Sequence, residues 1–287
     1  DMGYLARNDI KKATVSSEYL YFPESKKGNF RDFNLSFDSS FSRNGNGETL
    51  PSEVSLAVKA TTQGSSSIVS KYLVTTSGYD DLITRGHGSV KLPNKQDWSI
   101  EYNSPYSGKL HYQVGYHHLQ EGINDWADSL QLSLDYSFAD NLMLSTRLFH
   151  LSSDDWLIGN SAGELTRYQR KFNQYSVNLL WLLAENQELS IKSQWFGVTA
   201  RNGKNFSYLA QSVGNNENVD DFKQSQLSMQ VRYRYRFAAL SDFYVVYVRN
   251  GGYYQQGDDL LSNRKIFSQQ FDQPDDHQVL VKMRVRF

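Results

Sequence analysis

The sequence predicts an all-β protein, an antiparallel transmembrane β-barrel of about 14 strands. Three observations lead to this expectation: apolar and polar residues alternate along most of the chain, tight turns alternate with longer polar connections, and the last strand ends on an aromatic residue. In a bilayer, the apolar side chains of such strands face lipid and the polar ones face the lumen. We expect a single barrel domain over residues 1–287, with the C-terminal part of a longer barrel protein as the alternative.

The alternation is clearest between Gln226 and Phe237. Successive side chains of a strand point to opposite sides of its sheet, so the apolar residues of this run share one face. Shorter runs of the same kind follow one another along the chain, and no long helical period competes with them. The expected strands lie near residues 11–22, 33–41, 54–60, 68–76, 98–102, 110–116, 130–138, 142–148, 175–183, 189–195, 226–237, 243–249 and 277–287.

The connections are sorted by length from residue 104 onward. Short turns on one side and long loops on the other are typical of an outer-membrane barrel, with the short turns in the periplasm. Residues 79–96 are ambiguous between one loop and a short strand plus a hairpin, so the strand count is 13 or 14. An even count starts the chain in the periplasm, whereas an odd count starts it outside and implies earlier strands. The expected corners are 104–108, 138–141, 184–187 and 238–242, and the expected long connections are 119–127, 152–167, 201–221 and 250–276.

The last strand carries a candidate barrel-assembly signal. Apolar residues alternate with polar ones up to the terminal Phe287. This pattern resembles the signal that outer-membrane barrels present to their insertion machinery, which makes the barrel-assembly machinery an expected partner. The residues of the signal are Val281, Met283, Val285 and Phe287.

The composition fits strands that cross a membrane. Hydrophobic residues make up 39% and the mean hydropathy is −0.59, so no run reaches the apolar length of a spanning helix. A spanning strand needs only about 9–11 residues, and aromatic residues at 14% suit interfacial girdles. The net charge of −1 gives no indication of nucleic-acid binding. The chain begins without a secretory signal peptide, so we expect a mature form or a fragment.

Several stretches resemble one family. They are residues 2–9 (MGYLARND), 187–198 (QELSIKSQWFGV) and 230–252 (QVRYRYRFAALSDFYVVYVRNGG). They are similar to the C-terminal barrel portion of an uncharacterised Gram-negative outer-membrane β-barrel family, whose members carry an N-terminal carbohydrate-binding domain of the family-nine-like type. The resemblance implies the fold and a location in the cell outer membrane, but it transfers no catalytic residues. Members place the first stretch well inside the barrel, so another chain or an N-terminal barrel half is an expected partner.

Two groups of side chains are candidates for binding. Cations on the last strands are expected to line the lumen, either to bind or conduct anionic groups or to pair with carboxylates on neighbouring strands. Aromatic residues in the long connections are expected either to stack on an extracellular ligand such as a glycan or to form the outer girdle. The cations are Arg232, Arg234, Arg236, Lys282, Arg284 and Arg286, and the aromatic residues are Trp126, Trp156, Tyr208, Tyr253 and Tyr254.

Enzyme and metal chemistry find little support in the sequence. His150 with Ser145 or Ser152 and Asp154 could form a hydrolase site, but no motif supports it. No histidine spacing suits a metal, and the acid-rich segments 215–221 and 272–276 match no calcium loop. We therefore expect no catalytic residues, no metal and no cofactor.

The expected function is a non-catalytic outer-membrane barrel that acts as a channel, a docking platform or a translocation partner with a link to glycans. Outer-membrane lipid and lipopolysaccharide are its expected surroundings. The alternatives are a subunit that closes or plugs a larger outer-membrane assembly and an outer-membrane barrel hydrolase.

Overall fold

The computed structural model describes residues 9–24, 28–85, 87–123, 125–159, 164–206, 218–257 and 259–286. Within them the chain forms one 14-stranded antiparallel sheet, a separate two-stranded hairpin and one short helix. The expected all-β fold with one large antiparallel sheet is confirmed. The strands are β1 (Ile10–Tyr21), β2 (Phe30–Asn44), β3 (Glu53–Thr62), β4 (Ser67–Thr75), β5 (Gly78–Asp80), β6 (Val90–Leu92), β7 (Lys95–Asn103), β8 (Leu110–Glu121), β9 (Asp125–Ala139), β10 (Leu142–Gly159), β11 (Leu165–Ala184), β12 (Gln187–Phe206), β13 (Asn218–Val219), β14 (Phe222–Ala238), β15 (Ser241–Gln256) and β16 (Asp276–Arg284), and the helix is α1 (Asn263–Asp272).

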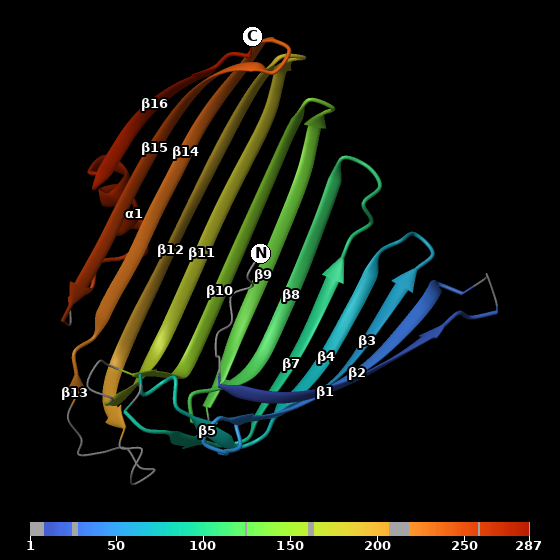
Figure 1. Cartoon of the computed structure of the whole chain (residues 1–287), viewed down its shortest axis with the longest axis vertical. Coiled ribbons are helices and arrows are strands. Elements are labelled where there is room, and N and C mark those ends of the chain that lie inside the picture. Colours follow the sequence, from blue (N-terminus) through green and yellow to red (C-terminus); the bar gives the residue numbers. More distant parts are fainter. Residues whose placement is uncertain are drawn as a thin grey trace.

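The strands of the large sheet lie side by side in chain order. Figure 1 shows them from β1 in blue to β16 in red as one strongly bent sheet, with α1 beside the red edge. β1 pairs with β2 and β16 pairs with β15, and no pairing joins β1 to β16 among the described residues. The path from β1 to β16 has thirteen strands, since β13 pairs only with β12. Because antiparallel neighbours alternate in direction, the two edge strands run the same way.

The register gives the sheet an apolar face and a polar face. Residues that pair across neighbouring strands point to the same side. One continuous row on the apolar face crosses twelve strands from Tyr21 to Gly251, whereas the row one position away includes Lys59, Glu101 and Gln226. The members of the apolar row are Tyr21, Phe33, Ala60, Ile68, Tyr102, Val114, Leu132, Leu148, Tyr175, Trp195, Leu227 and Gly251.

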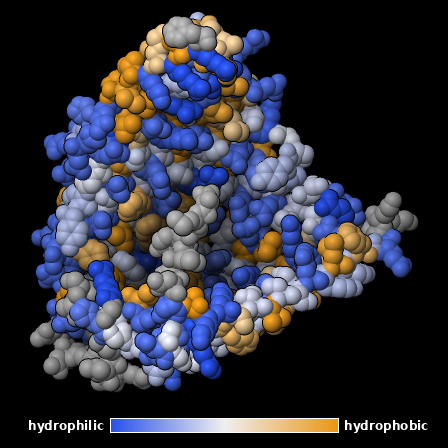
Figure 2. Space-filling model, viewed as in Figure 1, coloured by the Kyte–Doolittle hydropathy of each residue, from blue (hydrophilic) through white to orange (hydrophobic). Residues whose placement is uncertain are grey.

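Most large side chains of the apolar face are exposed. Among the described residues, no second layer of sheet or helix covers this face as a core would, apart from α1 at one end. The surface in Figure 2 is hollowed at its centre and mainly hydrophilic there, with hydrophobic patches toward the upper and lower rims. Exposed members of the apolar face include Tyr19, Leu35, Phe37, Leu56, Tyr72, Trp98, Ile100, Val114, Tyr116, Leu130, Leu148, Tyr175, Val177, Trp181, Phe237, Val279, Val281 and Met283.

The tight corners are confirmed, but the long connections are shorter than the sequence suggested. The turns 104–109, 140–141, 185–186 and 239–240 join strands at one end of the sheet, here called the short-turn end. At the other, long-loop end, β10 runs to Gly159 and β11 begins at Leu165, so the expected loop 152–167 is mostly strand. Strand pairing continues past the alternating residues because backbone hydrogen bonds do not need apolar side chains. The expected loop 119–127 shrinks to 122–124 for the same reason.

Two long connections contain structure of their own. Residues 76–94 form the β5–β6 hairpin, and Val90 and Leu92 pack with Leu157 and Leu165 at the long-loop ends of β10 and β11. This buried cluster is small for a chain of 287 residues. The connection 257–275 contains α1, which the sequence reading missed because its apolar positions are few. No helix among the described residues is long and apolar enough to cross a membrane.

Candidate functional site

The polar face of β14 carries the predicted arginines, and each of them meets a carboxylate. Arg232 pairs with Glu188 of β12 at 2.7 Å, and Arg234 pairs with Asp242 of β15 at 2.9 Å. Arg236 lies 3.6 Å from the same Asp242 carboxylate. Sequence reasoning found no acidic partner on the alternating part of β15, because Asp242 stands in the corner that precedes it.

The cations of β16 extend this polar wall. In register, Arg284 lies opposite Asp242 and Lys282 lies opposite Tyr244, and the backbone N–H of Arg286 donates to Ser241 Oγ over 3.1 Å. Lys282 and Arg284 of the edge strand β16 are exposed, and so is Arg286, which follows the strand. The predicted cationic wall is therefore assembled in space, and the one carboxylate of Asp242 lies between its two halves.

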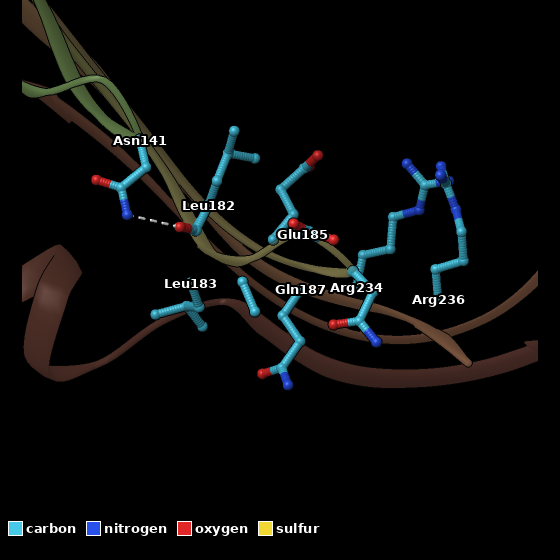
Figure 3. A pocket seen from close by; sticks show the side chains of 10 residues that line it. Asn141, Leu182, Leu183, Glu185, Gln187, Arg234 and Arg236 are labelled. Atoms are coloured by element: carbon cyan, nitrogen blue, oxygen red, sulfur yellow. Dashed lines mark hydrogen bonds between the residues drawn. The ribbon is translucent and has the colours of Figure 1, made fainter. Parts of the chain in front are cut away.

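A hollow beside this wall marks the short-turn end. It has a volume of about 460 Å³ and lies between the β11–β12 turn and β14. Figure 3 shows Arg234 and Arg236 extending side by side on one flank, with Glu185 and Gln187 on the turn and the Asn141 side chain donating to the Leu182 carbonyl. The lining carries charges of both signs, from Arg234 and Arg236 and from Glu185 and Glu188, so it suits transient contact with polar or charged groups.

The predicted aromatic residues divide between the two faces of the sheet. Trp156 and Tyr254 both contact Phe222, with ring centroids 6.2 Å apart in each pair, and Tyr168 packs edge-on against the same ring. Trp126 instead stacks on His118, which lies in register with Trp98 of the apolar face. Tyr253 lies in the register of Ser225 on the apolar face, and Tyr208 lies outside the described residues.

Beneath Trp156 lies a charged network that sequence reasoning missed. Arg170 stacks on the Trp156 ring at 4.8 Å and pairs with Glu121 at 2.5 Å. Arg167 bridges the fully buried Asp155 at 2.5 Å and Asp125 at 3.2 Å. These contacts tie the ends of β8, β9, β10 and β11 together, so the network stabilises the long-loop end. Its partners are about 12 to 50 residues apart in sequence and show no local motif.

Helix α1 is fixed to the apolar face by one buried amide. Gln270 Oε1 accepts hydrogen bonds from Trp195 Nε1 at 3.0 Å and from Ser225 Oγ at 3.1 Å. Its Nε2 donates to the carbonyls of Ser225 at 3.2 Å and of Gly251 at 3.0 Å. Gly251 leaves room for this contact, because a Cβ there would lie 3.0 Å from the Gln270 carbonyl oxygen. A buried amide with all these partners satisfied holds the helix in one position.

Of the residues considered from the sequence for a hydrolase site, His150 pairs with Asn173 at 2.8 Å on the apolar face and Ser152 lies on the same face. Ser145 lies opposite Asp135 on the polar face, and Asp154 stands in the irregular part of β10 between Ser153 and Trp156. No group of three or more potential metal ligands occurs among the described residues. The described members of the assembly signal, Val281, Met283 and Val285, are exposed on the edge strand, and Phe287 lies outside the described residues.

The comparison with protein families gives a match over nearly the whole chain. The model of a domain of unknown function (DUF5916) matches residues 1–286. No curated protein sequence is significantly similar to the chain. The chain belongs to the DUF5916 family.

Proposed function

We propose that this protein is a non-catalytic β-barrel of the outer membrane of a Gram-negative bacterium, acting as a channel, a docking platform or a translocation partner. The observation that supports this most is the continuous apolar row that runs from β1 to β15 on one face of the sheet. Lipid is the solvent that such a face requires, because soluble monomers rarely expose contiguous apolar patches beyond a few hundred Å². Transfer of these side chains from water to lipid is favourable by about 25 cal/mol for each Å² of apolar surface that leaves water.

The polar face supplies the working surface of this proposal. A lumen lined by Arg232, Arg234 and Arg236 with their carboxylates has charges of both signs, which suits docking of polar segments as well as passage of small ions. The aromatic cluster around Phe222 lies at the long-loop end, which is extracellular in this orientation. Aromatic rings stack on sugars, and the family resemblance adds a link to carbohydrate.

A part in a larger assembly is the second candidate, and the edges of the sheet favour it. Every residue of β1 and β16 is exposed, and the two strands run the same way. In lipid an unpaired backbone group costs several kcal/mol, so these edges need partners. Self-closure would need a parallel pair, whereas one added strand, or any odd number, restores antiparallel pairing on both sides. A partner chain or a further barrel segment could supply these strands.

Single-cysteine labelling tests the membrane proposal directly, because the chain has no cysteine. Neighbouring positions of β14 are matched in depth and differ only in face: Val231→Cys and Tyr233→Cys on the apolar face, Gln230→Cys and Arg232→Cys on the polar face. In vesicles, a water-soluble maleimide should label the second pair and spare the first. Equal labelling of all four, or a protein that stays monodisperse without detergent, would refute the proposal.

Two further measurements separate the functional alternatives. Single-channel recording in planar bilayers distinguishes an open lumen, with stepwise conductance, from a plugged or docking barrel. The native mass in mild detergent tests the larger assembly, which requires either a second chain or a longer polypeptide beside the 33.0 kDa of this one. A particle of one chain with protected edge amides would support self-closure.

A further inference from the structure

Three cations gather on the apolar face, above the apolar row. Lys171 of β11, Thr199 of β12 and Lys223 of β14 are directly paired in register, and Arg201 is the next residue of β12 on that face. This line lies four residues beyond Tyr175, Trp195 and Leu227, toward the long-loop end. The cations therefore stand where the sheet passes from apolar to polar side chains, on the face that the proposed function turns to lipid.

No carboxylate forms an ion pair with Lys171, Arg201 or Lys223 among the residues that the structure describes. The Lys223 side chain is buried, and its Nζ donates to the Leu261 carbonyl over 2.7 Å. Buried charges are normally paired with an opposite charge. Within the described residues, the three cations therefore lack the anion that would balance them.

The three cations line one pocket of about 560 Å³. Its floor includes Ser152, Asn173 and Thr199, whose hydroxyl and amide groups can donate hydrogen bonds. Its outer wall is the segment Leu260 to Asn263, which leads into α1. Among the described residues that line it, Asp154 is the one carboxylate, against the charges of Lys171, Arg201, Lys223 and the Glu121-paired Arg170. The lining therefore keeps a positive balance.

Helix α1 extends this site toward the membrane. Gln270 fixes the helix on the apolar face, while Phe267 and Phe271 remain about half exposed, at 45% and 46%. Arg249 lies 4.9 Å above the Phe271 ring. Exposed aromatic rings beside cations are typical of the boundary between headgroups and acyl chains. A ligand with a charged group and apolar chains could therefore contact the cations with the one and the exposed apolar side chains with the other.

We propose that this pocket binds the phosphate group of a membrane lipid, with Lys171, Arg201 and Lys223 on the headgroup and the acyl chains along the apolar face below. The inference rests on the proposed function, because it takes the apolar face to be in lipid. Phosphate suits the site, since its several acceptor oxygens can accept charge-assisted hydrogen bonds from more than one cation at once. A free anion would use the cations alone and would leave the apolar surface unused.

The test compares lipid binding of the detergent-purified protein with that of two variants. In native mass spectrometry, the protein is titrated with phosphatidic acid, with phosphatidylcholine, and with phosphatidic acid in the presence of inorganic phosphate. The site variant is Lys171→Gln/Arg201→Gln, in which both changed residues are exposed. The control is Arg147→Gln/Lys192→Gln, which removes the same charge from exposed residues in polar-face register. Lys223 is left intact because it is buried.

We expect the parent protein to bind phosphatidic acid more tightly than phosphatidylcholine, and the site variant to lose about tenfold or more of that affinity. The control should keep the parent affinity within about twofold. An unchanged site variant, or a control that loses as much, would overturn the site. Full displacement by inorganic phosphate would show a free-anion site instead of a lipid site. Failure of the membrane proposal itself would appear separately, as a parent protein that stays dispersed without detergent.

Discussion

The two groups of cations in this protein differ in how their charge is balanced. On the polar face, Arg232, Arg234 and Arg236 meet Glu188 and Asp242, with N–O distances of 2.7 to 3.6 Å. On the apolar face, Lys171, Arg201 and Lys223 form no ion pair among the described residues, and the one of them that is buried donates to a backbone carbonyl. Each cation of the first group therefore has a carboxylate in reach, whereas the second group is the one that we propose to bind a lipid phosphate.

The difference follows from where each group stands on the strands. The polar-face arginines sit near the short-turn end, where tight turns bring carboxylates from neighbouring strands within reach. The apolar-face cations stand at the opposite end, where Asp154 is the single carboxylate among the described residues that line their pocket. A positive charge that a protein leaves unbalanced at the edge of an apolar band is suited to the negative headgroups found there.

The largest expected effect comes from removing the carboxylate that two arginines share. Asp242→Asn should lower the free energy of unfolding, because Arg234 and Arg236 both lose the carboxylate that they share. Urea-induced unfolding in lipid vesicles, followed by Trp fluorescence, measures the change. Asp135→Asn, a polar-face carboxylate with no ion pair among the described residues, serves as the control and should change stability by less than about 0.5 kcal/mol. Equal effects would mean that the pairing contributes nothing.

A smaller effect is expected from releasing the wall of the apolar-face pocket. Gln270→Leu leaves Trp195 Nε1 and Ser225 Oγ without their acceptor, at a cost of about 1–2 kcal/mol to the docking of α1. Limited proteolysis should then cut within 259–275 faster than in the parent. Gln269→Leu, on the neighbouring exposed position, is the matched control. Unchanged cleavage would show that the buried amide does not hold the helix.

Much of the sheet could be predicted from the sequence, because alternation of period two fixes which side chains share a face. The strand from Leu227 to Phe237 and the turns around residues 140 and 185 are examples of features that the sequence predicted. The long-loop end could not be predicted in the same way. There β10 and β11 continue as strands of mixed residues, and the contacts of Arg167, Arg170 and Gln270 join segments far apart in the chain. Such contacts depend on register and on loop packing, which leave no local pattern.

The two groups of cations show the same limit of prediction from sequence. The run of Arg232, Arg234 and Arg236 is visible because it lies within one strand. Lys171, Arg201 and Lys223 come from three strands, and each looks like an ordinary polar residue in its own segment. Only the pairing of β11 with β12 and of β12 with β14 brings them to one pocket. The run that the sequence displays most clearly is the one whose arginines each meet a carboxylate of a neighbouring strand.

The smallest expected effect is a gain in stability, whereas Asp242→Asn is expected to lower stability. Lys223→Met removes a buried charge that lacks a carboxylate and keeps most of the side-chain volume, so stability should be unchanged or rise by up to about 1 kcal/mol at neutral pH. Unfolding in lipid vesicles at pH 7, followed by Trp fluorescence, measures the change. A loss of more than about 1 kcal/mol at pH 7 without added anionic lipid would mean that the Lys223 charge is already balanced within the chain.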